Sequence, residues 1–149
     1  MKRQEEFKSK KLPEYKDPNE LKKDIVIGIM NYDKIKEALE NLRFEFRKTQ
    51  EILNNGNLTE LKREKIEFKV LELIYKIGDK EKESEILKEK VLENLISYIK
   101  TKRQMHKDGL IKVKHNDPDY YIYNEKIETH KVAEILYKNL SCYIKAQGY

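Results

Sequence analysis

The sequence predicts a mainly α-helical protein, an antiparallel helical bundle followed by a small C-terminal β-hairpin and a final helix. Long segments repeat apolar residues at helical spacing, and only five Gly and three Pro interrupt the 149 residues. The connections between these segments are short, which favours antiparallel packing. We expect a flexible tail over 1–16, a helical bundle over 17–107, and the hairpin with the last helix over 108–149.

The first expected helix begins after the polar, aperiodic tail. Asp17 can cap a helix, and Pro18 suits the first helical position. The run from Ile25 to Ile29 fits this helix or a short strand, because β-branched residues favour strands. A stronger helical pattern covers 31–54 and ends at a Gly- and Asn-rich segment. Its expected buried face is Ile35, Leu39, Leu42, Phe46, Thr49 and Leu53.

Two more helices are expected over 57–78 and 82–102. Asn57 is the predicted cap of the first, and the pair Gly78-Asp79 is predicted to end it. The first of these helices has a wide apolar stripe, so we expect it at the centre of the core. Its apolar residues are Leu61, Ile66, Phe68, Val70, Leu71, Leu73, Ile74, Tyr75 and Ile77, and those of the second are Ile86, Leu87, Val91, Leu95, Tyr98 and Ile99.

The pattern changes after Gly109. Ile111, Val113 and His115 alternate with lysines, which predicts a strand, and the turn signal over 116–119 leads into a second strand-like run over 120–123. The two runs together predict a β-hairpin. A last helix over 129–146 is expected to bury Val132, Ala133, Leu136, Leu140, Tyr143 and Ile144.

The basic excess is concentrated in the tail and in one internal segment. The net charge is +5, and residues 101–115 hold five bases and one acid. Lysines neutralise phosphates and aromatic faces stack on bases, so this segment and the tyrosines after it predict a single-strand binding site. The alternative is a solvated helix end leading into a hairpin whose tyrosines pack on the bundle. The candidate nucleic-acid-binding residues are Lys102, Arg103, Lys107, Lys112, Lys114, Tyr120 and Tyr121, with His106, His115 and Tyr123 alongside.

Residues that carry catalysis are scarce, and we expect no enzyme, no catalytic residues, no metal and no cofactor. Neither a phosphate-binding glycine loop nor a dinucleotide fingerprint is present, and the three histidines form no ligand motif. Cys142 is expected to be a small core residue rather than a nucleophile. The row Glu81, Glu85, Glu89 and Glu93 lines one helical face, which is either a solvated face or a dock for a basic partner.

Composition also bears on location. Apolar runs stay far below the roughly 18 residues that a membrane span needs, and the first residues are too polar for a secretory signal. We therefore expect a cytoplasmic protein without a membrane partner. The bias toward Lys and Glu with few Gln is typical of thermophiles and of AT-rich genomes.

Several segments resemble the archaeal GINS proteins, which are replication-complex subunits. Residues 12–15 (Leu-Pro-Glu-Tyr) are similar to the GINS N-terminus, and 63–66 (Arg-Glu-Lys-Ile) resemble a central GINS helix. Glu83, Leu87, Val91, Leu95 and Ile96 resemble the next helix, and 110–123 with 131–136 resemble a reduced form of the small GINS β-rich domain. This resemblance implies a scaffold that binds other protein subunits and touches a replicative helicase.

Two other classes stay open. The size, basic balance and helix series resemble the small helical subunit of type III CRISPR effector complexes, which implies a subunit that lines an RNA strand. Arg103 and His106 resemble the Arg and His of small helical RNases of the HEPN type, although they are spaced more closely here. We expect a non-catalytic helical subunit of a nucleic-acid-handling complex, with protein subunits as partners and single-stranded nucleic acid as a second partner.

Overall fold

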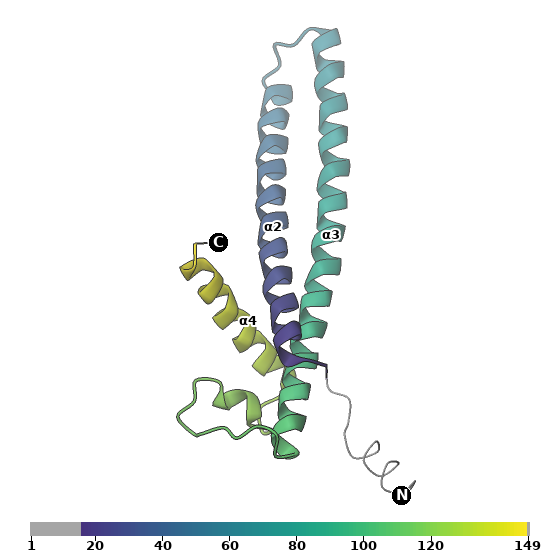
Figure 1. Ribbon diagram of the computed structural model, residues 1–149. Helices are drawn as coiled ribbons and strands as arrows, with labels where there is room; N and C mark the ends of the chain where they lie inside the picture. Colours follow the sequence, from purple (N-terminus) through teal and green to yellow (C-terminus); the bar gives the residue numbers. More distant parts are fainter. Residues whose placement is uncertain (1–15, 149) are drawn as a thin grey trace, which may run out of the picture. The chain divides into compact units, whose positions relative to one another are not determined.

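The computed structural model describes residues 16–148, so the expected tail lies outside the described residues except for Lys16. The elements, in chain order, are α2 (Pro18–Asn54), α3 (Glu60–Lys107), the short 3-10 helix η1 (Tyr120–Tyr123) and α4 (Thr129–Ala146) (Figure 1). The expectation of a mainly helical protein is confirmed, and the last helix has the predicted bounds. The chain divides into two compact units, which we name unit 1 (residues up to 26 and 92–148) and unit 2 (residues 27–91).

Both long helices continue where the sequence predicted interruptions. The run from Ile25 to Ile29 is helical, and α3 passes through Gly78 without a break. A glycine inside a helix costs about 1 kcal/mol relative to alanine. Leu73 before it and Val91 after it are both buried in the contact with α2, so packing on the two sides outweighs that cost. The predicted boundary at Gly78 was therefore wrong.

Side chains and glycines define the helix ends. The Asn19 backbone N–H donates to Asp17 Oδ1 at 3.0 Å, which confirms the predicted cap of α2. Thr59, rather than the predicted Asn57, caps α3, because its Oγ1 accepts the Lys62 N–H at 3.4 Å. Gly109 has φ 76° and follows α3. The N–H groups of Gly109 and Leu110 donate back into the last turn of α3, which is a Schellman stop.

Unit 2 is a helical hairpin in which α2 and α3 run antiparallel around a turn at Gly56, where φ is 75° (Figure 1). A Cβ at Gly28 would stand 2.7 Å from Val91 Cγ2, so the two helices approach closely where α2 has no side chain. Along the hairpin, Arg43 pairs with Glu81 at 3.0 Å and Lys69 with Glu45 at 3.3 Å. The buried hydrophobic side chains of this unit are Ile29, Leu39, Leu73 and Val91.

Unit 1 brings together the first turns of α2, the last turns of α3, η1 and α4. Because four segments converge, side chains from each are enclosed. Tyr143 and Cys142, both expected in this core, are instead exposed on α4. The core side chains are Leu21, Ile25, Leu95, Tyr98, Ile99, Ile122, Val132, Ala133, Leu136, Leu140 and Ile144.

The predicted β-hairpin is wrong: residues 16–148 contain no strand, and 120–123 form η1. The turn that was expected to connect two strands instead starts the 3-10 helix. The Tyr120 N–H donates to Asp117 O and the Ile122 N–H to Asp119 O, both at 3.0 Å. The 3-10 helix buries the Ile122 side chain in the core of unit 1. An isolated two-stranded hairpin is only marginally stable, so burial of this side chain outweighs strand pairing. The β-rich domain that the GINS resemblance implies is thus absent from this part of the chain.

The expectation that the apolar segment 61–77 lies at the core centre was also wrong. Only α2 packs against this part of α3 within unit 2, and two helices in contact each cover one face of the other. One half of the wide stripe is therefore enclosed or partly enclosed, and the other half is exposed. The exposed residues include Leu61, Phe68, Leu71, Ile74 and Tyr75, and Ile86 of the next predicted helix is exposed as well.

Candidate functional site

The basic segment predicted to bind nucleic acid lies in unit 1, where Arg103 has a different set of partners. Its Nε donates to Ile122 O at 2.6 Å, and its two terminal nitrogens donate to Thr129 Oγ1, Asn124 O and Ile127 O at 3.0–3.2 Å. A guanidinium offers five N–H donors in a planar fork, so it can hold several carbonyls at once. Arg103 thus fastens the segment from η1 to the start of α4 onto α3.

Two further bases of the segment also have partners inside unit 1. Lys107 Nζ lies 2.7 Å from Glu125 Oε1, and this hydrogen bond lowers the pKa of the Glu125 carboxyl. Lys102 Nζ lies 5.8 Å from the centre of the Tyr98 ring, within the range of a cation–π contact. Each of these lysines thus has a partner inside its own unit.

The predicted tyrosines also have neighbours within unit 1. The His115 ring lies 4.6 Å from the Tyr120 ring, and Asn139 Nδ2 donates to Tyr121 Oη at 3.3 Å. Burial raises the pKa values of Tyr121 and Tyr123. Burial also raises the pKa of Tyr98 to about 12, with Asp119 as the next cause. These phenols stay neutral at physiological pH and belong to the packing of the unit.

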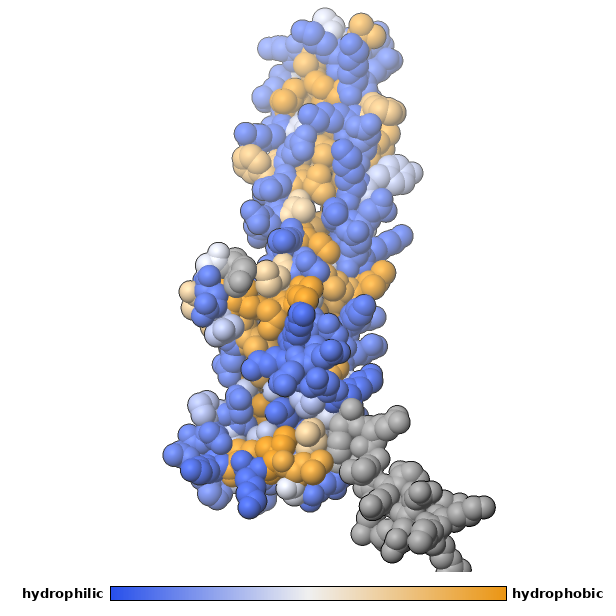
Figure 2. All heavy atoms as spheres, in the orientation of Figure 1, coloured by the Kyte–Doolittle hydropathy of each residue, from blue (hydrophilic) through white to orange (hydrophobic). Residues whose placement is uncertain are grey.

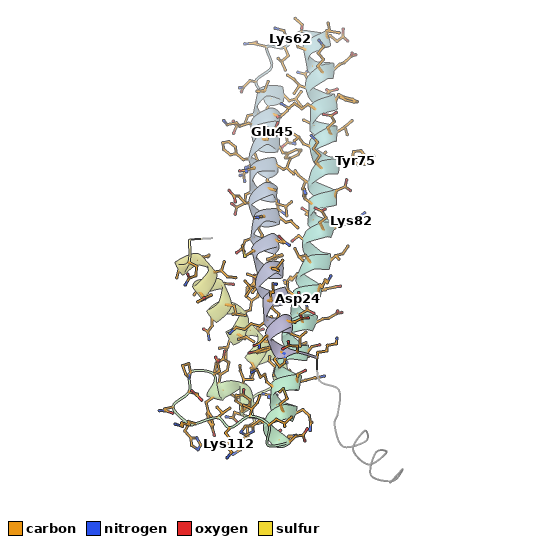
Figure 3. The ribbon with its side chains drawn as sticks, in the orientation of Figure 1. Asp24, Glu45, Lys62, Tyr75, Lys82 and Lys112 are labelled. Atoms are coloured by element: carbon orange, nitrogen blue, oxygen red, sulfur yellow. The ribbon has the colours of Figure 1, made fainter. Side chains whose placement is uncertain are left out.

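Lys112 and Lys114 remain as exposed bases of the predicted site. Both lie on the connection between α3 and η1, and Figure 3 labels Lys112 there. The structure therefore separates the seven predicted residues into five with partners inside unit 1 and two lysines on a surface loop. Arg103 was predicted to bind phosphate, but its N–H groups donate to three backbone carbonyls and a hydroxyl of its own unit.

A pocket of about 240 Å³ lies elsewhere in unit 1. Its floor is apolar, with Ile25, Tyr98, Leu136 and Leu140, while Lys22 and Asp119 bring opposite charges to its lining. No sequence pattern marks this pocket, because its lining comes from α2, α3 and α4 and from the residue that precedes η1.

The other candidate surface is the outer face of α3 in unit 2, which we name the α3 stripe (Leu61, Phe68, Leu71, Tyr75 and Ile86). At about 100° per residue these five side chains fall within an arc of about 80°. The centre of this arc is opposite the face that carries Leu73 and Val91 toward α2. Figure 3 shows Tyr75 on the side of α3 turned away from α2, and this side chain is 76% exposed.

The sequence contained a signal for the α3 stripe. Leu61, Phe68 and Tyr75 recur every seven residues, so they lie on one face of the helix. Apolar residues also occupy the opposite face, so the sequence did not show which of the two faces packs against α2. In Figure 2, hydrophobic side chains reach the surface along the hairpin between charged ones. Large exposed apolar patches mark interaction sites, whereas isolated exposed side chains are ordinary. Five large exposed apolar side chains share this arc, with charged residues between them, and we take their shared direction as a mark of the first kind.

The acidic row has a mixed environment. Glu81 is engaged by Arg43, and its side chain remains half exposed. Glu85, Glu89 and Glu93 are exposed. This arrangement fits the solvated-face interpretation at Glu85, Glu89 and Glu93, while Glu81 takes part in the contact between α2 and α3.

Over residues 16–148, no group of three or more His, Cys, Asp or Glu side chains is placed to hold a metal ion. The described helices include none that combines the length and apolar character needed to cross a membrane. Comparison with protein-family models, with curated proteins and with solved structures gave no match.

Proposed function

We propose that the chain is a non-catalytic helical subunit of a nucleic-acid-handling assembly, in which it acts as a scaffold. The observation that carries this proposal is the α3 stripe, where five large, exposed apolar side chains share one arc on the outer face of a long helix. A helix whose apolar row lacks a partner in its own unit offers a docking surface for another protein. The GINS resemblance implies the same kind of role.

The nucleic-acid part of the proposal depends on the loop that carries Lys112 and Lys114. Both side chains are exposed, and two phosphate contacts support weak, salt-dependent binding rather than sequence recognition. The alternative of a small RNase gains no observation from this geometry, because the guanidinium of Arg103 is hydrogen-bonded within unit 1 and the His106 ring packs 5.0 Å from Tyr123.

The scaffold role is tested by placing a photo-cross-linking residue at Tyr75 and, as a control, at Glu40, which is exposed on α2 of the same unit. Cross-linking is carried out in the cells that produce the protein. We expect protein adducts from position 75 and few from position 40. Equal yields at the two positions, or none at position 75, would contradict the scaffold role.

The nucleic-acid role is tested with fluorescence anisotropy of labelled single-stranded RNA and DNA at low and moderate salt. Each phosphate contact to a single strand contributes about 0.7 to the slope of log K against log salt, so Lys112→Glu with Lys114→Glu should lower the slope by about 1.4. The control exchanges Lys131 and Lys138, exposed on α4 of the same unit, for Glu and changes the net charge equally. Equal losses in both variants would show a general charge effect and remove the loop from the proposal.

A further inference from the structure

The α3 stripe has a composition that fits a second copy of itself. We infer that two copies of this chain associate through their α3 stripes, antiparallel, with a twofold axis between Leu71 and Tyr75. This inference rests on the proposed function, because it names the partner that covers the same face. It is carried by the arrangement of apolar, small and charged residues along α3.

The apolar row is complementary to itself when the helix is reversed. In a register where the numbers of facing residues add up to about 147, Leu61 faces Ile86 of the second copy and Leu71 faces Tyr75 of the second copy. Each of these contacts occurs twice because of the symmetry. The register therefore uses the full length of the stripe and leaves neither end without an apolar partner.

The same register brings Phe68 close to Gly78 and Asp79 of the second copy. Among the described residues, nothing lies within 4 Å of the point where a Cβ would stand at Gly78. The chain therefore places no bulky side chain at position 78, where the second copy would approach.

Charged residues that lie between the apolar members of the stripe also fit the antiparallel direction. Glu64 and Lys82 lie at nearly the same angle around the helix, close to the seam, and the register sets each against the other in the second copy. In a parallel pair, each of them would face its own equivalent with the same charge. Figure 3 shows Lys82 on the side of α3 turned away from α2, the side that carries Tyr75.

One flank of the stripe adds two more complementary pairs. Lys65 faces Glu83 of the second copy, and Glu72 faces Lys76 of the second copy, in both cases with numbers that add up to 148. On the other flank the register brings Glu67 near Glu81 of the second copy. Glu81 already accepts a hydrogen bond from Arg43 at 3.0 Å. The positive charge of Arg43 therefore reduces the repulsion between Glu81 and Glu67 of the second copy.

The first test measures mass against concentration by sedimentation equilibrium on the full chain. Leu71→Gln with Tyr75→Gln should raise the dimer Kd more than tenfold. Both residues lie next to the twofold axis, so each substitution removes the same apolar contact from both copies. The matched control is Phe44→Gln with Ile52→Gln, which removes two similarly exposed apolar side chains from α2 of the same unit. A monomeric wild type, or equal effects of the two double variants, would overturn the inference.

The second test measures direction by disulfide trapping in a Cys142→Ser background. Positions 61 and 86 are 25 residues apart, about 37 Å along a helix. Two cysteines bridge only when their Cα atoms lie within about 7 Å. Mixed Leu61→Cys and Ile86→Cys chains should therefore link to each other, and neither should link to itself. Self-linked chains of each variant would overturn the antiparallel direction.

The charge pairs give a rescue experiment. Lys76→Glu should weaken the dimer by roughly fivefold, because it opposes two like charges at each of two equivalent sites. Glu72→Lys with Lys76→Glu restores opposite charges and should restore the Kd, with helicity monitored by circular dichroism. Failure of the double exchange to recover any affinity would contradict the register.

These outcomes can be separated from those of the scaffold test. A monomeric purified chain whose position 75 still cross-links to another protein in cells would overturn the second copy and leave the scaffold role standing. A monomeric chain with no adduct at position 75 would overturn both. Self-adducts at position 75 with a dimeric mass would support both.

Discussion

Unit 1 and unit 2 share the same two long helices, but they use their apolar residues in different ways. Of the fifteen buried hydrophobic side chains in the described part of the chain, eleven lie in unit 1 and four in unit 2. In unit 1, η1 and α4 cover the helix faces that α2 and α3 leave open. Unit 2 has no third element among the described residues, so each helix covers only one face of the other and the α3 stripe is exposed.

The polar contacts of unit 1 are also more enclosed than those of unit 2. In unit 1, Arg103 donates to four acceptors, three of which are backbone carbonyls. In unit 2, the pairs Arg43–Glu81 and Lys69–Glu45 have side chains that are about half exposed. Exposed ion pairs contribute about 0–1 kcal/mol, so unit 2 depends on packing along a single seam. Unit 1 thus encloses its core with its own elements, whereas unit 2 leaves one face of α3 exposed.

The largest expected effect comes from removing a buried leucine of unit 1. Leu95 is 2% exposed, and Leu95→Ala should lower the free energy of unfolding by about 2–5 kcal/mol. Leu71→Ala in the α3 stripe should lower it by less than about 0.5 kcal/mol in dilute, monomeric protein. Urea unfolding followed by circular dichroism measures both. Similar losses for the two variants would remove the distinction between the units.

The next effect concerns the two arginines. Arg103→Lys should cost about 2–3 kcal/mol, because an ammonium group cannot replace a planar fork that holds four acceptors. Arg43→Lys in unit 2 should change stability by less than about 1 kcal/mol, since the ion pair with Glu81 is exposed and a lysine can remake it. The two variants are compared by chemical unfolding at one pH. An unchanged free energy of unfolding in Arg103→Lys would show that the carbonyl contacts add little to stability.

The close approach of α2 and α3 gives a smaller effect. Gly28→Ala gains up to about 1 kcal/mol of helix propensity but brings a Cβ to 2.7 Å from Val91 Cγ2. The rotamers of a helical valine are restricted, so overpacking of about 1–3 kcal/mol should dominate. We expect a net loss of about 1 kcal/mol. Gly28→Ala with Val91→Ala should recover part of it, and a stabilised single variant would contradict the packing.

The last effect is a pH dependence that originates in unit 1. The folded pKa of Tyr98 is raised to about 12 from its ordinary value of 10.0, so the unfolded chain loses its proton first as pH rises. This contribution to stability is fully present below pH 10 and is lost between pH 10 and about 12. Tyr98→Phe should flatten the decline in that interval. An unchanged alkaline profile in Tyr98→Phe would assign the decline to other groups.

The helical parts of the fold could be predicted from local chemistry. The cap at Asp17 follows from residue types at fixed offsets, and the bounds of α4 follow from its apolar spacing. The break expected at Gly78 failed because a glycine marks a helix end only when packing on both sides permits one. The β-hairpin failed because alternation describes a preference, whereas burial of Ile122 depends on the helices around it.

The candidate sites were harder to predict for the same physical reason. The sequence shows that Arg103 is a base, but its acceptors lie 19 to 26 residues away and are mostly backbone carbonyls, which any residue type supplies. The sequence showed the apolar residues of the α3 stripe. They were predicted to lie in the core because this helix has so many apolar residues, and that prediction was wrong. Which half of a wide stripe is covered depends on how many elements pack against it.

The central claim is that unit 2 is completed by a partner while unit 1 is already complete. Hydrogen–deuterium exchange of the full chain at low and high protein concentration tests it directly, with Leu71→Gln/Tyr75→Gln as the reference. Amides of α3 within 61–86 should become more protected at high concentration in the wild type only, while those around Leu95 and Ile99 should be equally protected throughout. Protection of 61–86 that is independent of concentration and equal in the two proteins would contradict the claim.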